Sequence, residues 1–124
     1  NDLKDNVFLP GYKSNVYEYL SNCKLFILSS LWEDPGFVIL EAMHAKSLVL
    51  SSDCPSGPKE IISHTENRGI LFKSNNIDDF LIKFSEVKNI DVNKVKLLKL
   101  NAKKFTKNFT IFSHYKSLIK ILDT

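Results

Sequence analysis

The sequence predicts an α/β fold with a mostly parallel sheet flanked by helices. Short apolar runs alternate with stretches of helical periodicity along the 124 residues. The connections between them span a few residues, as in right-handed parallel βαβ units. Hydrophobic residues make up 44% of the chain and charged residues 25%, which fits one domain with a buried core. Together these observations indicate a Rossmann-like domain.

The first half of the chain predicts two strands and two helices. Residues 7–9 form an apolar run that a Pro-Gly pair ends, as expected for a strand. Ser14 is placed to cap a helix that ends at Cys23. The apolar residues of this segment recur at helical spacing. The continuous apolar run at residues 25–28 predicts a strand covered on both faces of the sheet. A second helix is expected over residues 36–46.

The second half predicts two more strands and a helical end. Residues 48–50 and 69–72 are expected as strands, with a short helix over residues 59–64 between them. A following helix carries one apolar stripe, formed by Ile77, Phe80, Leu81 and Phe84. The terminal helices are expected over residues 91–124, where an amphipathic stripe is formed by Phe112, Tyr115, Ile119 and Leu122. The aromatic side chains from Phe105 to Tyr115 are expected to face the core.

Four strand signals are fewer than the five or six of a doubly wound nucleotide-binding domain. The chain also begins with Asn1 rather than Met. We therefore expect residues 1–124 to form a single domain that is truncated on its N-terminal side.

Charge is distributed unevenly. Residues 1–82 carry a balance of −4, and residues 83–124 carry ten lysines and a balance of +7. The basic end fits either lysines that solvate the outer faces of helices or contact with an anionic membrane, whereas nothing indicates nucleic-acid binding. No apolar run is long enough to span a bilayer. The two cysteines are expected as reduced thiols, and the three scattered histidines predict no metal site.

The segment at residues 29–36 follows a predicted strand and leads into a helix, where open α/β sheets bind ligands. Gly36 allows close approach to the backbone, and the N–H groups of Phe37 and Val38 can donate to phosphate or sugar oxygens. Glu33 and Glu41 offer carboxylate acceptors that suit the vicinal hydroxyls of a sugar or ribose. Glutamates at such positions also serve only the helix dipole or solvation. A paired-carboxylate glycosidase is a further alternative that nothing else supports.

The full order of motifs is more specific. The strand at residues 25–28, the Glu33-to-Glu41 element, and the segments at residues 48–53 and 57–61 follow one another. This order resembles the C-terminal domain of the retaining GT-B glycosyltransferases of family GT4, the glycosyl transferases group 1. The resemblance covers residues 6–85. The Glu-Asp-Pro-Gly-Phe form and the Cys-Pro-Ser-Gly-Pro-Lys-Glu segment at residues 54–60 are similar to bacterial members that build surface polysaccharides.

The resemblance implies a role for each site residue. Glu33 contacts the donor sugar at the reaction centre, and Glu41 holds the ribose. The sugar and the diphosphate accept hydrogen bonds from the backbone of Gly36, Phe37 and Val38. The nucleobase is bordered by Gly11 and Tyr12. Trp32 is expected to pack as partial core.

The chain departs from the family's pattern in two ways. Pro35 replaces the aromatic residue that usually precedes the glycine. The Arg and Lys that grip the diphosphate have no match here, so we expect this chain alone to be inactive.

The resemblance implies a retaining transferase that moves a hexose or N-acetylhexosamine to a glycan or lipid-linked acceptor in polysaccharide, lipopolysaccharide or glycoconjugate biosynthesis. A missing N-terminal domain would bind the acceptor. We expect no metal or other cofactor, a UDP-sugar rather than a GDP-sugar as donor, and a place in the bacterial cytoplasm, including the inner face of the membrane. The alternatives are a non-catalytic nucleotide-sugar- or partner-binding module and an unrelated doubly wound regulator domain.

Overall fold

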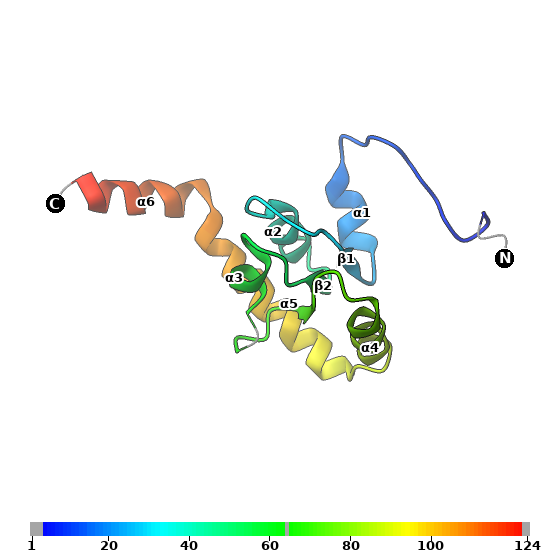
Figure 1. Ribbon diagram of the computed structural model, residues 1–124. Helices are drawn as coiled ribbons and strands as arrows, with labels where there is room; N and C mark the ends of the chain where they lie inside the picture. Colours follow the sequence, from blue (N-terminus) through cyan, green and yellow to red (C-terminus); the bar gives the residue numbers. More distant parts are fainter. Residues whose placement is uncertain (1–3, 64, 123–124) are drawn as a thin grey trace.

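The computed structural model describes residues 4–63 and 65–122 (Figure 1). Three parallel strands form one sheet in the order β1-β2-β3, with β1 at Phe26–Leu28, β2 at Val49–Ser52 and β3 at Ile70–Phe72. Helices alternate with the strands along the chain. The predicted α/β class with a parallel sheet is therefore confirmed.

The helices follow the predicted order. They are α1 (Val16–Asn22), α2 (Phe37–His44), α3 (Pro58–Ile62), α4 (Ile77–Lys88), α5 (Val92–Thr106), the 3-10 turn η1 (Lys107–Phe109) and α6 (Ile111–Leu122). The residue that precedes α1 as its N-cap is Asn15 rather than the predicted Ser14. The predicted end of the third helix, His64, lies outside the described residues.

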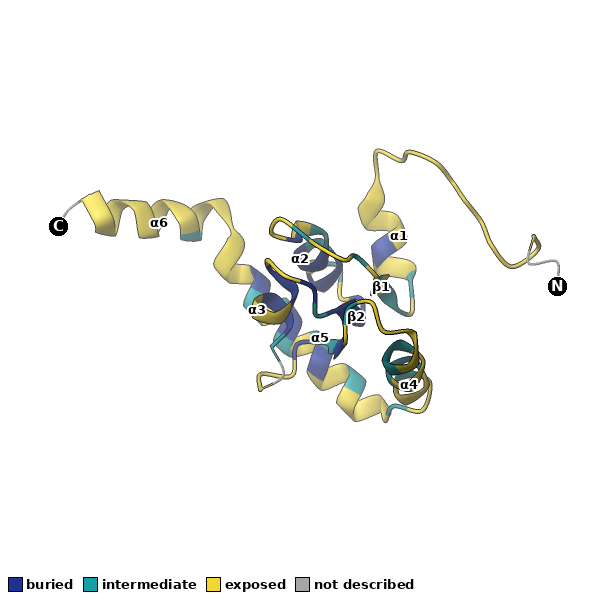
Figure 2. Cartoon of the chain, in the orientation of Figure 1, coloured by how far each residue is buried: buried dark blue, intermediate teal, exposed yellow. Residues whose placement is uncertain are grey.

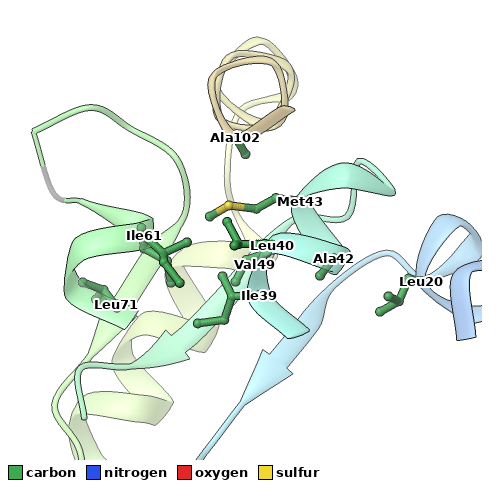
Figure 3. Close-up of a cluster of buried hydrophobic side chains, with 10 residues drawn as sticks. Leu20, Ile39, Leu40, Ala42, Met43, Val49, Ile61, Leu71 and Ala102 are labelled. Atoms are coloured by element: carbon green, nitrogen blue, oxygen red, sulfur yellow. The ribbon is translucent and has the colours of Figure 1, made fainter. Parts of the chain in front are cut away.

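The main core lies between α2 and one face of the sheet (Figure 3). Helix α2 contributes four buried side chains, Ile39, Leu40, Ala42 and Met43. The same cluster includes the strand residues Val49 and Leu71 and four residues from three other helices, namely Leu20 of α1, Ile61 and Ile62 of α3, and Ala102 of α5. Burial of this apolar surface fixes α2 on the sheet.

The opposite face of the sheet is covered over β2 and β3 only. Side chains alternate between the faces of a strand, so Leu50 and Phe72 point away from α2. The Phe72 ring contacts the Phe80 ring of α4 with 5.1 Å between the centroids. Among the helices that the structure describes, none covers β1 on this side, and Ile27 remains 41% exposed. The prediction that residues 25–28 are covered on both faces was wrong for this reason.

Only half of the apolar stripe predicted for α4 packs against the rest of the protein. Phe80 and Phe84 stack on each other with 5.8 Å between the ring centroids, and both are partly buried. Ile77 and Leu81 are exposed, which corrects the prediction. The strands against which α4 packs are β2 and β3.

Residues 7–9 form no strand, contrary to the prediction. A strand needs hydrogen bonds to a neighbour, and this segment lies apart from the sheet (Figure 1). Its apolar side chains are exposed, Leu9 to 88%.

Helix α6 extends away from the sheet, and most of its residues are exposed (Figure 2). Phe105 packs against the core, but Phe109, Phe112 and Tyr115 are all more than half exposed. The expectation that this aromatic run faces the core is therefore wrong beyond Phe105. Among the described helices, none is both long and apolar enough to cross a bilayer.

Asp53 connects the ends of β2 and β3. One carboxylate oxygen accepts from the Ser74 backbone N–H at 2.8 Å, and the other lies 3.5 Å from Nζ of Lys59. The Ser74 hydrogen bond, with help from the Lys59 ammonium and against desolvation, holds the pKa of Asp53 below its ordinary value of 3.8. Because this pKa is lower in the folded than in the unfolded protein, the ionised carboxylate stabilises the fold above about pH 4.

We predict that Asp53→Asn lowers the free energy of unfolding by about 1 kcal/mol at pH 7. The difference from wild type should shrink as the pH falls below about 4, because wild-type Asp53 then becomes protonated. Urea denaturation at several pH values measures this, with exposed Asp5→Asn as the control. A difference that stayed constant down to pH 2 would contradict the assigned role.

Candidate functional site

The segment at residues 29–36 lies at the carboxyl end of β1 and leads directly into α2. Gly36 is the N-cap of α2 in the left-handed conformation, with φ 79° and ψ 42°, and no side chain caps this end of the helix. The first N–H groups of a helix lack partners within the helix. Phe37 and Val38 therefore present backbone donors that have no partner among the described residues, at a place where the helix dipole favours an anion.

Glu33 lies beside this helix end. A Cβ built on Gly36 would lie 3.6 Å from the Glu33 Cβ and 3.7 Å from its Cγ. The half-buried side chain accepts a hydrogen bond at Oε1 from the Ser30 hydroxyl at 2.5 Å. The site thus combines a fixed carboxylate with a helix N-terminus.

A second loop, at residues 53–57 after β2, supports the first. The Glu33 N–H donates to the Pro55 carbonyl at 3.4 Å. Gly57, at φ +126°, allows close contact with Pro35, since an added Cβ would lie 2.0 Å from the Pro35 carbonyl oxygen. The Asp34–Pro35 peptide bond is cis. Only glycine fits at residue 57 without moving the loop that carries Glu33.

Glu41 lies in the wall of a cavity of about 760 Å³ between α2 and the corner where α5 leads into α6. Phe37 and His44, on the same side of α2, also line it, together with Tyr17, Phe109 and His114 among others. Glu33 is not among the lining residues. The expectation that Glu33 and Glu41 hold the sugar and the ribose of one donor thus stays a prediction.

Gly11 and Tyr12 lie in the segment before α1, which extends away from the body of the molecule (Figure 1). Gly11 has a positive φ of +66°, and Tyr12 is 94% exposed. The structure does not bring them to α2, and their assignment to a nucleobase stays a prediction.

Some residues near the site were missed or misplaced by sequence reasoning. The Ser30 and Ser52 hydroxyls were not singled out, because a serine after a strand has many possible partners. Trp32 was expected as partial core but is 62% exposed. The ion pair between exposed Lys59 and Asp53 was not predicted, because the two residues become neighbours only in the folded loop.

Among the described residues, no three His, Cys, Asp or Glu side chains lie close enough together to hold one metal ion. Cys23 and Cys54 are free thiols, and Cys54 is buried.

Comparison with known families gives a match over residues 1–105 to the family described as glycosyl transferases group 1. This confirms the resemblance drawn from the residues.

Two curated bacterial relatives have assigned activities. The chain is 35% identical over 91 residues to a poly(ribitol-phosphate) alpha-N-acetylglucosaminyltransferase of Staphylococcus aureus, covering 73% of the chain and 18% of that protein. It is 29% identical over 75 residues to an N-acetylgalactosamine-N,N'-diacetylbacillosaminyl-diphospho-undecaprenol 4-alpha-N-acetylgalactosaminyltransferase of Campylobacter jejuni, covering 60% of the chain and 20% of that protein. The chain thus spans about a fifth of the length of these relatives.

Among solved structures, the chain is similar to Alr3699/HepE of Anabaena, crystallised in complex with UDP. The TM-score is 0.82 at 22% sequence identity, and the match covers 98% of the chain and 33% of the Anabaena protein. The likeness confirms the fold.

We predict that Gly57→Ala lowers the free energy of unfolding by about 2–4 kcal/mol, because the new methyl group strains the backbone and collides with the Pro35 carbonyl. Gly11→Ala is the matched control. It also places alanine at positive φ but has no atom within 4 Å of the new Cβ, so we expect a loss below about 1 kcal/mol. Urea denaturation compares the two, and equal losses would contradict the close contact between the loops.

Proposed function

The chain belongs to the glycosyl transferases group 1 family, and on that premise we propose that it is the donor-binding part of a retaining glycosyltransferase. The donor is a nucleotide diphosphate sugar, and a hexose or N-acetylhexosamine moves to a glycan or lipid-linked acceptor. The observation that carries the proposal is the uncapped N-terminus of α2 with the Glu33 carboxylate beside it. Such an arrangement suits a ligand that has both anionic oxygens and hydroxyl donors.

Each part of the donor has a partner in this proposal. The diphosphate accepts hydrogen bonds from the N–H groups of Phe37 and Val38, which need no reorganisation as negative charge develops on the leaving group. Glu33 accepts from sugar hydroxyls and positions the ring for attack from the face of the leaving group. Glu41, one turn further along α2, accepts from the ribose hydroxyls. No metal or cofactor takes part.

The relatives support the class of sugar and nucleotide. Both bacterial relatives are named as transferases of an N-acetylhexosamine in alpha linkage. The Anabaena protein was crystallised with UDP. These names favour a UDP-activated sugar in this protein and a role in surface-glycan synthesis. Because the chain matches about a fifth of each relative's length, the acceptor site belongs in this proposal to other residues of the natural protein.

A non-catalytic nucleotide-sugar-binding module is the alternative, and turnover distinguishes the two. The natural protein at full length should release UDP from a UDP-sugar if it is a transferase. A module would bind the nucleotide sugar and leave it intact.

We also propose contact with an anionic membrane at the cytoplasmic side. Residues 92–122 contain eight lysines and no acidic residue. Helix α6 adds exposed apolar side chains, including Ile111, Phe112 and Ile119. Two of the lysines, Lys116 and Lys120, lie in α6 and the other six in α5 and η1. An exposed apolar helix next to this basic charge fits a surface of anionic lipids.

The membrane proposal predicts that the full-length protein sediments with vesicles of phosphatidylglycerol and phosphatidylcholine, but not with phosphatidylcholine alone. About 1 M salt should release it, since the Debye length is then about 3 Å. Phe112→Ser should weaken the binding several-fold, whereas the control Ser117→Ala should not. Equal binding to both kinds of vesicle would contradict the electrostatic part of the proposal.

For the donor site, we predict that Glu41→Ala in the full-length protein weakens UDP binding about 10- to 30-fold, because the ribose hydroxyls lose a charged acceptor. Calorimetric titration with UDP measures the change. Glu86→Ala, which removes an exposed glutamate from α4, is the control and should leave the affinity unchanged. Full UDP affinity in the Glu41 variant would show that the ribose assignment is wrong.

A further inference from the structure

Two serine hydroxyls form a continuous path from the sheet to the Glu33 carboxylate. Ser52, the last residue of β2, is 1% exposed and donates from Oγ to the Ser30 carbonyl at 2.6 Å. Ser30 in turn donates from Oγ to Oε1 of Glu33 at 2.5 Å. The carboxylate is thereby connected through one residue to a strand of the buried sheet.

This path binds only one of the two carboxylate oxygens of Glu33. The hydroxyl of Ser30 is bonded to Oε1, and no hydrogen bond joins Oε2 to any part of the chain that the structure describes. A short hydrogen bond from a hydroxyl to a carboxylate is stronger than one between neutral groups. It therefore restricts rotation of the Glu33 side chain and keeps Oε2 available as an acceptor.

The backbone of Ser30 is fixed independently of its side chain. The Ser52 hydroxyl is buried, so water cannot replace it as the donor to the Ser30 carbonyl without entering the protein. The backbone contact of Glu33 with Pro55 holds the same loop at its other end. Ser30 thus has a fixed position from which its side chain orients Glu33.

We propose that Ser30 is a positioning residue for Glu33, with Ser52 holding Ser30 in place. Ser30 fixes the carboxylate with Oε2 directed to a hydroxyl of the donor sugar. The inference rests on the proposed function, because it assumes that Glu33 contacts the sugar. We therefore expect loss of the Ser30 hydroxyl to weaken binding of the sugar part of the donor. Binding of the nucleotide part, which Phe37, Val38 and Glu41 hold, should not change.

The experiment compares two affinities in the natural protein at full length. Calorimetry gives the Kd of UDP and of whichever of UDP-glucose, UDP-N-acetylglucosamine and UDP-N-acetylgalactosamine binds wild type most tightly. The Kd of UDP divided by the Kd of the UDP-sugar is the ratio that reports how much the sugar contributes to binding. Ser30→Ala should leave the Kd of UDP unchanged and weaken UDP-sugar binding about five- to tenfold, as expected for one lost hydrogen bond to a charged group.

Two further variants separate positioning from folding. Ser30→Thr keeps the hydroxyl and should restore the ratio. Ser29→Ala removes the neighbouring exposed hydroxyl, which forms no hydrogen bond with the described residues, and should match wild type. An unchanged ratio in Ser30→Ala would overturn the inference. An equal loss for UDP and UDP-sugar would overturn it as well, because that result indicates a distorted loop rather than a misdirected carboxylate.

Glu33→Gln distinguishes failure of this inference from failure of the proposed function. If Glu33→Gln leaves the ratio unchanged, Glu33 does not hold the sugar and the proposed function fails at that residue. If Glu33→Gln lowers the ratio and Ser30→Ala does not, Glu33 keeps its role and only the positioning role of Ser30 is lost.

Discussion

The parallel pairing of β1 with β2 is the constraint on which the site depends. Leu28 pairs with Ser51, so both strands end at the same edge of the sheet and their loops emerge side by side. The contacts of Glu33 with Pro55 and of Gly57 with Pro35 follow from that register. A one-residue slip would turn the buried side chains of β2 to the wrong face and separate the loops.

Helix α2 serves both the core and the site because its two functions use different parts of the helix. Its buried side holds Ile39 and Met43 against the sheet, and its first turn presents the N–H groups of Phe37 and Val38, which no described side chain caps. Burial makes the helix rigid, and a rigid helix keeps those donors in place without a capping side chain. Such preorganised donors suit a reaction in which negative charge develops on a leaving diphosphate.

The C-terminal helices contrast with this rigid part. Helix α5 packs on α2 and contributes Ala102 to the core, whereas α6 leaves Phe112 and Tyr115 exposed. The apolar side chains of α6 thus remain available to bind another surface. The lysines of α5 and α6 favour a surface with negative charge. The two proposed functions meet at the start of α6, because Ile111 and His114 line the same cavity as Glu41.

The sequence by itself determined the α/β class, the order of helices and strands after residue 15, and the Glu33-to-Glu41 element. These features depend on local periodicity and on a motif that is continuous in the chain. It did not determine that residues 7–9 lack a strand partner, that α4 leaves Ile27 uncovered, or that α6 extends from the body. It also could not pair Ser52 with Ser30, or Gly57 with Pro35. Those outcomes depend on which distant segments meet, and only the packed sheet and its register decide that.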